Sequence, residues 1–599
     1  MSIELLKRVS LVGSLAQKHA AMDRLQALGC MHLVPLVAQP SEPEQRLPLR
    51  AEDTRKALRY LVDERRKRRQ LRSDDDFDMA ATVERVLENR DRLRRALDHR
   101  DMLAQRARDL AAWGDFSLPP AEEIGGRRLW FYTLPLRQLH ALEALELPWQ
   151  IVHRDNRQAF VVLISCEEPA DDILPVPRDH TGSHSLGEVR EALEAAESAL
   201  DEARAERQEL TRYLFLLSKH FARAEDRAVL RHAQTQTLDD DHLFAVQGWV
   251  GASRLTAVEA LADEQGLALV IEDPAPGDTP PTLLLNPPEI GAGEDLVRFY
   301  QMPAYGAFDP SRVLFFSFAL FFAMILADAG YAAFLGLLLL AFWRRLGRTA
   351  SGRRFRTLAT TIVSASVLFG VAVGSYFGVA PTEDGIASRL QVFDLNNFDA
   401  MIRLSVGVGV AHVVLANLVR LGSLWPRRTA LAPLGWSLAA LSGFTLWLST
   451  DSGREALAVP AWTGLLTGLG LVFLFSSERS GGGLRETLLR GVDGLLALTS
   501  ISKLFGDTLS YLRLFALGLA SASLAITFNE LALEVRSVPG LGLLLELLLL
   551  LIGHSLNLLL ALVSGVIHGL RLNYIEFYNW ALSGEGYPFR PFEKTEIKE

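Results

Sequence analysis

Long apolar runs in the second half of the chain constrain the fold more than any other feature. They fall at about 313–343, 357–380, 400–420, 431–450, 460–476, 505–535 and 540–575. A membrane-spanning helix needs about 20 mainly apolar residues, so these runs are close to or beyond that length. Charge divides the 599-residue chain in the same way, because residues 1–300 carry 90 charged side chains and residues 301–599 only 43. The sequence therefore predicts a charged domain over 1–300 and a polytopic α-helical membrane domain over 301–599.

Composition also excludes several classes of function. Two cysteines, Cys30 and Cys166, are too few for a disulfide framework or a four-cysteine zinc site, and we expect neither a metal nor another cofactor. The net charge of -9, without a basic stripe, argues against nucleic acid as a partner. No GxxxxGK[ST] motif occurs, so the chain shows no phosphate-binding loop for ATP. We therefore expect a protein that is not itself a catalyst of nucleotide hydrolysis.

Two charged stretches of the first half are expected to be the arms of an antiparallel coiled coil. They cover about 51–112 and 186–222. The second arm keeps apolar residues at a spacing of three to four from Leu186 to Leu217. Such a seam needs a second helix to bury it. The N-terminal residues lack the apolar core of a signal peptide, so we expect this domain to be cytoplasmic.

Short α/β segments flank the two arms, beginning with a strand, helix and strand over residues 8–36. We predict one lobe from residues 1–50 with 275–300, and another from 120–180 with 225–274. The result is a rod with a small α/β lobe at each end. Its charged surface is either a solvated face or a docking surface for other long helices, and the first half alone does not separate the two.

Basic loops predict the membrane topology. Three loops are rich in basic side chains: Arg344, Arg345, Arg348, Arg353, Arg354 and Arg356; Arg420, Arg427 and Arg428; and Arg479, Arg485, Arg490 and Lys503. They alternate with loops that carry one arginine each, so the positive-inside rule places the basic loops in the cytoplasm. Segment 313–343 must then enter and leave on one side. We predict two short helices broken near 328–330, eight crossings and a cytoplasmic C-terminus. The alternative is one tilted helix over 313–343, which would require residues 1–300 to be exported without a signal.

Arg513 lies about two turns inside the apolar segment 505–535, where a charge costs at least about 2.5–3.5 kcal/mol. A helix turns by 100° per residue, which places Ser510, Ala516, Ala520 and Ser523 on its face. Small side chains let another helix approach closely. The structural alternative is an arginine that pairs with Asp507 or Glu576.

The last apolar segment carries a polar stripe. Its members lie within about 60° of one another around the helix: Glu546, Asn557, Ser564, His568 and Arg571. Such a stripe faces protein or water rather than lipid. Snorkelling could explain Arg571 alone, His554 is more typical of a packing histidine, and Asp328 is as well suited to cap a helix as to carry ions.

Three motifs in the membrane domain resemble those of one known family. They are Ser510–Leu517, His568–Phe577 and the tail Gly584–Phe592, with weaker similarities at 248–250, 303–305, 309–310 and 328–331. The chain is similar to the membrane stator subunit, called subunit a or subunit I, of rotary V-type and archaeal-type ATPases. It has alanine where that family commonly has glycine, at Ala323, Ala327 and Ala332. Ala561 and Ser521 replace a carboxylate and a histidine found in some relatives, and we expect Glu546 and His554 to substitute for them.

The resemblance implies a non-catalytic subunit of the cell membrane that couples ion translocation, expected to be that of protons, to ATP hydrolysis or synthesis. Arg513 and Arg571 would meet the carboxylates of a proteolipid rotor ring. The outer half-channel would pass Glu530, Glu534, Glu546, His554 and Asn557. The inner one would pass Asp507, Ser510, His568 and Glu576, and Ser564 is a further candidate. Implied partners are the ring, peripheral-stalk subunits, a central-stalk or rotor-cap subunit, the soluble ATPase sector and membrane lipid.

Two other classes of protein stay open at this point. A secondary transporter would show inverted repeats and paired helix breaks, whereas this sequence has one candidate break, at 328–330. A membrane-anchored coiled-coil scaffold would explain residues 1–300 but not the polar stripe that ends at Arg571.

Overall fold

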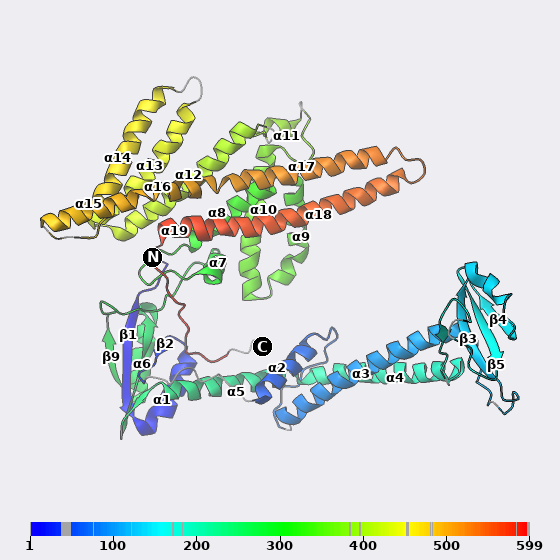
Figure 1. The fold of residues 1–599 in the computed structure, drawn as a ribbon. Helices are drawn as coiled ribbons and strands as arrows, with labels where there is room; N and C mark the ends of the chain where they lie inside the picture. Colours follow the sequence, from blue (N-terminus) through cyan, green and yellow to red (C-terminus); the bar gives the residue numbers. More distant parts are fainter. Residues whose placement is uncertain are drawn as a thin grey trace. The chain divides into compact units, whose positions relative to one another are not determined.

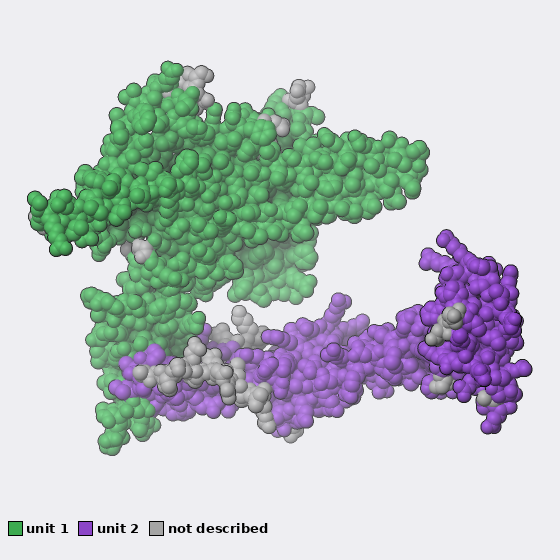
Figure 2. Space-filling view, viewed as in Figure 1, with its two compact units in different colours: residues 1–17, 29–34, 239–592 green, residues 18–28, 35–238, 593–599 purple. Residues whose placement is uncertain are grey.

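The structure, a computed structural model, is mainly α-helical and divides into two compact units (Figure 2). It describes residues 2–37, 49–75, 77–120, 122–170, 173–182, 184–382, 385–394, 397–450, 455–479, 481, 483–582 and 584–595. Unit 1 contains residues 1–17, 29–34 and 239–592, and unit 2 contains residues 18–28, 35–238 and 593–599. The predicted fold class is confirmed, with small sheets in the first half and long apolar helices in the second.

Unit 2 is built around two long antiparallel helices, α3 (Met79–Ala111) and α4 (Leu186–Leu210) (Figure 1). Asp78 caps α3 with its side chain, and Ser185 with Glu188 forms a capping box at the start of α4. Two further helices pack at one end of the pair, α2 (Leu49–Val62) and α5 (Leu214–Thr235). The helix α1 (Lys18–Leu28) belongs to the same unit.

The predicted first arm is not one continuous helix. Residues 51–112 form α2 and α3, and the described residues between these helices, 63–75 and 77–78, are not helical. Asn89 on α3 links this helix to both α2 and α4. It is fully buried and accepts a hydrogen bond from the hydroxyl of Tyr60 on α2 at 2.7 Å. Its amide also donates to Ala203 O at 3.0 Å and to Glu206 at 2.8 Å. One buried amide therefore links α2, α3 and α4, beside the apolar cluster that α2, α3 and the end of α4 share.

A four-stranded antiparallel sheet closes the far end of α3 and α4. Its order is β4-β5-β3-β6, with β3 (Arg128–Pro135), β4 (Trp149–Arg154), β5 (Gln158–Ser165) and β6 (Arg178–Asp179). Trp113 packs edge-on against Phe131 and Phe160 at centroid distances of 5.2 and 5.1 Å. One face of the sheet is thus fixed to the helix ends.

The second sheet belongs to unit 1 and corrects the predicted lobes. Its order is β2-β8-β1-β9, all antiparallel, with β1 (Leu6–Ser14), β2 (Met31–Val34), β8 (Leu243–Gly251) and β9 (Ala268–Glu272). Residues 243–272 therefore pair with the N-terminal strands, and their predicted place beside 120–180 was wrong. Strand pairing decides this, because β1 pairs with β8 along Leu6–Ser14 and with β9 along Arg8–Val12. Part of the predicted lobe 1–50, residues 38–48, lies outside the described residues.

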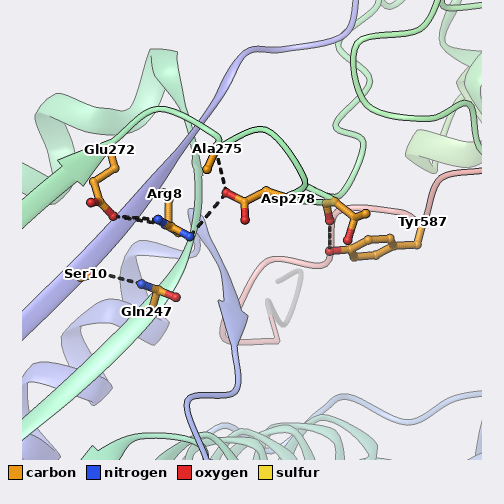
Figure 3. A network of polar contacts seen from close by, with 8 residues as sticks. Arg8, Ser10, Gln247, Glu272, Ala275, Asp278 and Tyr587 are labelled. Carbon is orange, nitrogen blue, oxygen red and sulfur yellow. Dashed lines mark hydrogen bonds and ion pairs between the residues drawn. The ribbon is translucent and has the colours of Figure 1, made fainter.

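Polar contacts tie the connection after β9 back to this sheet (Figure 3). Arg8 on β1 pairs with Glu272 at 3.1 Å and with Asp278 at 3.4 Å. The Tyr587 hydroxyl, from the C-terminal tail, donates to Thr279 O at 2.8 Å. The tail also bonds to β2, because Phe592 N donates to Met31 O at 2.8 Å. The tail that follows the last membrane helix is therefore anchored on the sheet.

Among the residues of the second half that the structure describes, seven helical stretches are long and apolar enough to cross a membrane: 329–346, 350–373, 398–424, 428–449, 455–475, 484–535 and 542–581. The shorter apolar helix α8 (Ser311–Leu326) precedes them. The corresponding helices are α9 (Ala329–Leu346), α10 (Ala350–Val373), α12 (Phe398–Leu424), α13 (Leu431–Ser449), α14 (Ala458–Phe475), α15 (Leu484–Leu498), α16 (Ile501–Leu509), α17 (Leu512–Val535) and α18 (Gly542–Arg571). A π-helical turn, Leu572–Phe577, and α19 (Tyr578–Ala581) follow α18.

The predicted break in segment 313–343 is confirmed. α8 ends at Leu326, Ala327 adopts a left-handed conformation with φ 46°, and Asp328 caps α9 by accepting from Tyr331 N at 2.9 Å. The count of eight crossings stays a prediction.

The remaining elements are short. They are the helices α6 (Leu255–Gln265), α7 (Gly291–Tyr300) and α11 (Ile386–Arg389), the strand β7 (Leu238–Asp239), and short 3-10 segments at Leu15–Gln17, Leu136–Leu142, Thr211–Tyr213, Ala252–Arg254, Arg428–Ala430 and Glu455–Leu457.

Candidate functional site

The two arginines of the sequence motifs lie at the same end of one helix pair. α17 and α18 run antiparallel and side by side (Figure 1). Arg513 is in the first turn of α17, and Arg571 is the last residue of α18. The two guanidinium groups are within electrostatic reach of each other. Antiparallel pairing thus brings together two charges that are 58 residues apart in the sequence.

Two further predicted residues surround this pair. Glu576, in the π-helical turn, is 2% exposed and within electrostatic reach of Arg513. His568 is within reach of both arginines. Nη1 of Arg513 and Oε2 of Glu576 are buried and have no hydrogen-bond partner among the described residues. The site therefore holds charged atoms whose hydrogen-bonding capacity this chain does not use.

The structural alternative for Arg513 was an ion pair with Asp507 or Glu576. No such pair within 4.0 Å is formed in the described part of the chain. Asp507 instead accepts a hydrogen bond from the Trp580 indole at 2.7 Å. The Ser510 hydroxyl bonds back to Gly506 O at 3.1 Å, which is a helix-internal contact.

The face of α17 around Arg513 is open in this chain. Arg513 itself is half-buried, whereas Arg571 and the small residues Ala516, Ala520 and Ser523 are exposed. An arginine exposed on a membrane-spanning surface is costly against lipid and is expected to face protein or water. Small neighbours permit the close approach of another helix. The face has the properties of a protein contact surface inside the membrane.

A second polar group of the site lies further along the same helix pair. His554 and Asn557 on α18 both contact the hydroxyl of Tyr331 on α9, at 2.7 and 3.0 Å. Asn557 also bonds to Ser521 on α17, and His554 Nε2 lies 3.0 Å from Asn529 Oδ1. We call these five residues the Tyr331 chain. They join three helices by side-chain hydrogen bonds.

The other predicted residues do not belong to the Tyr331 chain. Glu546 pairs with Arg536 at 3.6 Å, near the turn between α17 and α18. Glu530 and Glu534 are exposed on α17, and Ser564 is half-buried on α18. Within the described residues, none of these four forms a hydrogen bond or ion pair with a member of the Tyr331 chain.

The sequence did not single out Tyr331 or Asn529. Each of them is a polar side chain within an apolar segment, which is visible in the sequence. The helical periodicity does not show which residue is its hydrogen-bond partner. Asp328 has the capping role that the sequence left open, because its carboxylate accepts from Tyr331 N, Ser375 Oγ, Phe377 N and Gly378 N.

Comparison with known proteins places the chain in a family. Residues 497–594, which include both arginines and the C-terminal tail, match the model of the V-type ATPase 116kDa subunit family. V-type ATP synthase subunit I of Chlamydia muridarum is 30% identical over 478 residues, which cover 69% of this chain and 71% of that protein. The Chlamydia pneumoniae subunit I is 30% identical over 61% of this chain and 63% of its own length. A-type ATP synthase subunit I of Methanocaldococcus jannaschii is 27% identical over 69% of this chain and 64% of its own length.

The chain belongs to the subunit I family of V-type and A-type ATP synthases. It is a multi-pass membrane protein of a rotary ATPase, and other subunits of that complex are its partners. Family membership also answers the question of class that the sequence left open, because neither a separate secondary transporter nor a plain scaffold accounts for the match at 497–594.

Proposed function

We propose that this chain is the stator of a proton-translocating rotary ATPase, with Arg513 and Arg571 at its contact with a proteolipid rotor ring. The observation that carries the proposal is the pair of neighbouring arginines at one end of α17 and α18, on a face that is open in the single chain. In this orientation residues 1–300 and the C-terminus are cytoplasmic, as the basic loops predict.

Electrostatics explains what the arginines do. A ring carboxylate has to be neutral where it faces lipid, since a bare charge there is very costly. At this subunit it meets guanidinium groups that stay protonated at all physiological pH values. A nearby positive charge favours the ionised carboxylate and therefore proton release. The unused hydrogen-bonding capacity of Arg513 Nη1 supports an external acceptor at this point.

Two groups of polar residues support two offset half-channels. At the arginine end, Asp507, Ser510, His568 and Glu576 would form the inner path. Toward the turn between α17 and α18, His554 and Asn557 would belong to the outer path, with Glu530, Glu534 and Glu546 nearer its entrance. Ser564 lies between the two groups on α18. The arginine pair separates them and opposes a direct leak of protons.

The cytoplasmic domain would hold the membrane domain still while the ring turns. We propose that the sheet at the far end of α3 and α4 binds peripheral-stalk helices of the soluble ATPase sector, and that the sheet containing β1 lies near the central-stalk or rotor-cap subunit. A rod with charged, solvated faces and a sheet at its end is suited to such contacts. Membrane lipid surrounds the remaining helix faces.

ATP-driven proton uptake by vesicles that contain the assembled complex tests the proposal. Arg513→Ala is expected to abolish pumping while the complex still assembles, because the ring carboxylate loses its counter-charge. Arg485→Ala, at an exposed arginine of α15 outside the site, is the matched control and is expected to pump normally. Normal pumping by Arg513→Ala would contradict the proposal.

A further inference from the structure

A groove between α8 and α12 has no role in the proposed function. Its volume is about 460 Å³. Its walls include Phe316 and Leu320 from α8, and Ala411 and Leu415 from α12. Phe316 is 59% exposed, Leu320 43% and Leu415 40%. The groove is therefore open toward the surroundings of the membrane domain, which are either lipid or another subunit.

Arg312 places a positive charge at one end of this groove. It is the second residue of α8, where the chain passes from its charged first half into the apolar helices, and it is exposed. Among the described residues it has no hydrogen-bond or ion-pair partner. The nearest carboxylate in the sequence, Asp309, already accepts from Ser311 N at 2.9 Å and from Asn286 Nδ2 at 2.7 Å. The charge of Arg312 is therefore available to a group from outside the chain.

The charged and apolar parts of the groove follow one another along α8. Arg312, Phe316 and Leu320 are spaced by four residues, which places them on one side of the helix and spreads them over about 12 Å of its length. Arg312 is at the end of α8 that adjoins the charged half of the chain, so we place it at the membrane surface, with Phe316 and Leu320 deeper. A phospholipid has the same order of chemistry, with a phosphate at the surface and acyl chains below it.

The floor of the groove is formed by side chains that are already fixed. His412 is 6% exposed, and its Nδ1 lies 2.7 Å from the hydroxyl of Tyr511. Its ring stacks on Phe577 at a centroid distance of 4.8 Å and meets Phe321 edge-on at 5.1 Å. Nε2 of His412 is buried and has no hydrogen-bond partner in the described part of the chain. An occupant of the groove would thus lie against a preformed surface, which lowers the cost of binding.

A second groove, of about 490 Å³, shows why the charge of Arg312 matters. It lies between α12, α13 and α16, and no charged side chain is among the described residues that line it. Its walls therefore do not distinguish a lipid from an apolar helix of another subunit. The α8–α12 groove does, because an apolar helix laid over it would bury the guanidinium of Arg312 without a partner, at a high cost. An occupant that brings its own negative charge avoids this cost.

We propose that the α8–α12 groove binds an anionic phospholipid of the surrounding membrane. The phosphate would pair with Arg312, and one acyl chain would lie along Phe316, Leu320 and Leu415. Basic pockets between membrane helices bind anionic headgroups, and a guanidinium pairs with phosphate through two parallel hydrogen bonds. A zwitterionic headgroup fits less well, because the hydrogen-bonded carboxylate of Asp309 is not free to receive its ammonium group. This inference goes beyond the proposed function and does not depend on the rotor contact.

Photolabelling of the assembled complex in phosphatidylcholine vesicles tests the inference. The probe is phosphatidylglycerol with a photoactivatable group on one acyl chain, and the comparison is phosphatidylcholine that carries the same group. Mass spectrometry then identifies the labelled peptides. We expect the phosphatidylglycerol probe to label peptides that contain 312–321 and 408–415 about five-fold more than the phosphatidylcholine probe, which is the contribution of one arginine near the membrane surface. High salt should reduce this excess, because it screens an exposed charge pair.

Two substitutions remove the two parts of the site separately. Arg312→Gln should lower labelling by the phosphatidylglycerol probe to that by the phosphatidylcholine probe, since the charge is lost and the groove remains. Ala411→Phe should lower labelling of both peptides by both probes, because the exposed Ala411 lines the groove and a phenyl ring would fill it. Ala333→Phe, at an exposed alanine of α9 outside the groove, is the matched control and should be labelled like the unmodified complex.

Several results would overturn the proposal. Equal labelling by the two probes in the unmodified complex excludes a preference for the anionic lipid. Absence of label from both peptides excludes lipid and indicates that another subunit covers the groove. If Arg312→Gln does not assemble, the salt dependence and Ala411→Phe decide, and an excess of phosphatidylglycerol labelling that survives both overturns the site. None of these outcomes concerns the rotor contact, which Arg513→Ala tests by itself.

Discussion

Single residues in this chain hold distant segments together when they are buried and polar. Asp328 is the clearest case, because it caps α9 and also binds the loop after α10 through Ser375, Phe377 and Gly378. Phe377 has a positive φ of 54°, a conformation that a residue with a side chain adopts only when its surroundings hold it. One carboxylate thus fixes a helix break and a strained loop together.

His32 on β2 has a similar role outside the membrane, where it receives the C-terminal tail. Its Nδ1 accepts a hydrogen bond from Arg590 N at 2.9 Å, and its ring lies 5.8 Å from that of Tyr587 and 5.6 Å from that of Phe589. Burial lowers the pKa of His32 below its usual value of 6.5. Only the neutral imidazole can accept at Nδ1, so the docked tail selects that form.

We predict that the tail docks less firmly at low pH. The pKa of His32 is lower when the tail is docked than when it is released. His32 therefore contributes fully to the free energy of docking above about pH 6.5, and this contribution is lost as the pH falls through the pKa of the docked state. Hydrogen exchange of tail residues 584–595, corrected for the intrinsic effect of pH, should rise roughly several-fold between pH 7.5 and pH 5. In His32→Asn, which accepts without titrating, this rise should disappear. An equal rise in both chains would remove His32 as its cause.

Glycines decide how closely the elements of the membrane domain pack. A Cβ on Gly565 of α18 would lie 2.7 Å from Phe322 of α8, and one on Gly518 of α17 would lie 2.8 Å from Met324 O. α8 therefore approaches both helices of the arginine pair closely enough to exclude side chains. Packing of this kind replaces the hydrophobic effect as the force between helices in lipid.

Two neighbouring glycines provide a graded test of this packing. Gly565→Ala should destabilise the helix contact by about 1–3 kcal/mol, because the buried Phe322 has no room to move. Gly569→Ala should cost less, since its Cβ would lie 3.3 Å from Phe318 and small adjustments relieve that contact. Thermal aggregation of the purified chain in detergent measures the difference. Equal midpoints for the two variants would show that the close contact with α8 does not limit stability.

At the scale of the whole molecule, the far sheet of unit 2 is an insertion between the ends of two helices. Leu110 at the end of α3 and Leu186 at the start of α4 belong to one apolar cluster, and Asp115 accepts from Gly187 N at 2.7 Å. The helix ends therefore lie close together and could be joined without the sheet.

Replacing residues 128–179 by a short Gly-Ser linker should leave α3 and α4 paired but remove the proposed peripheral-stalk contact. We expect the complex to hydrolyse ATP without pumping protons, or to lose its soluble sector during purification. The ratio of proton uptake to ATP hydrolysis, with circular dichroism as a check on the helices, measures this. Full coupling in such a chain would contradict the stator role of unit 2.

Several features of this protein follow from its sequence alone. Hydrophobic length predicted the membrane helices, an arginine within an apolar segment and a polar stripe indicated the candidate site, and the alternation of basic loops predicted the break near Asp328. These signals are local or follow the helical repeat, so they need no knowledge of distant partners. The same reasoning predicted the strands β1 and β2 with a helix between them.

Tertiary structure alone decided which of these elements meet. Strand pairing joined β8 and β9 to β1, although the sequence suggested the other lobe, because alternation of apolar residues does not specify a partner strand. Helix packing brought Tyr331 of α9 to His554 of α18, which lie 223 residues apart. A polar residue in an apolar helix is satisfied only by a group that the fold carries to it, and its sequence neighbours do not reveal that group.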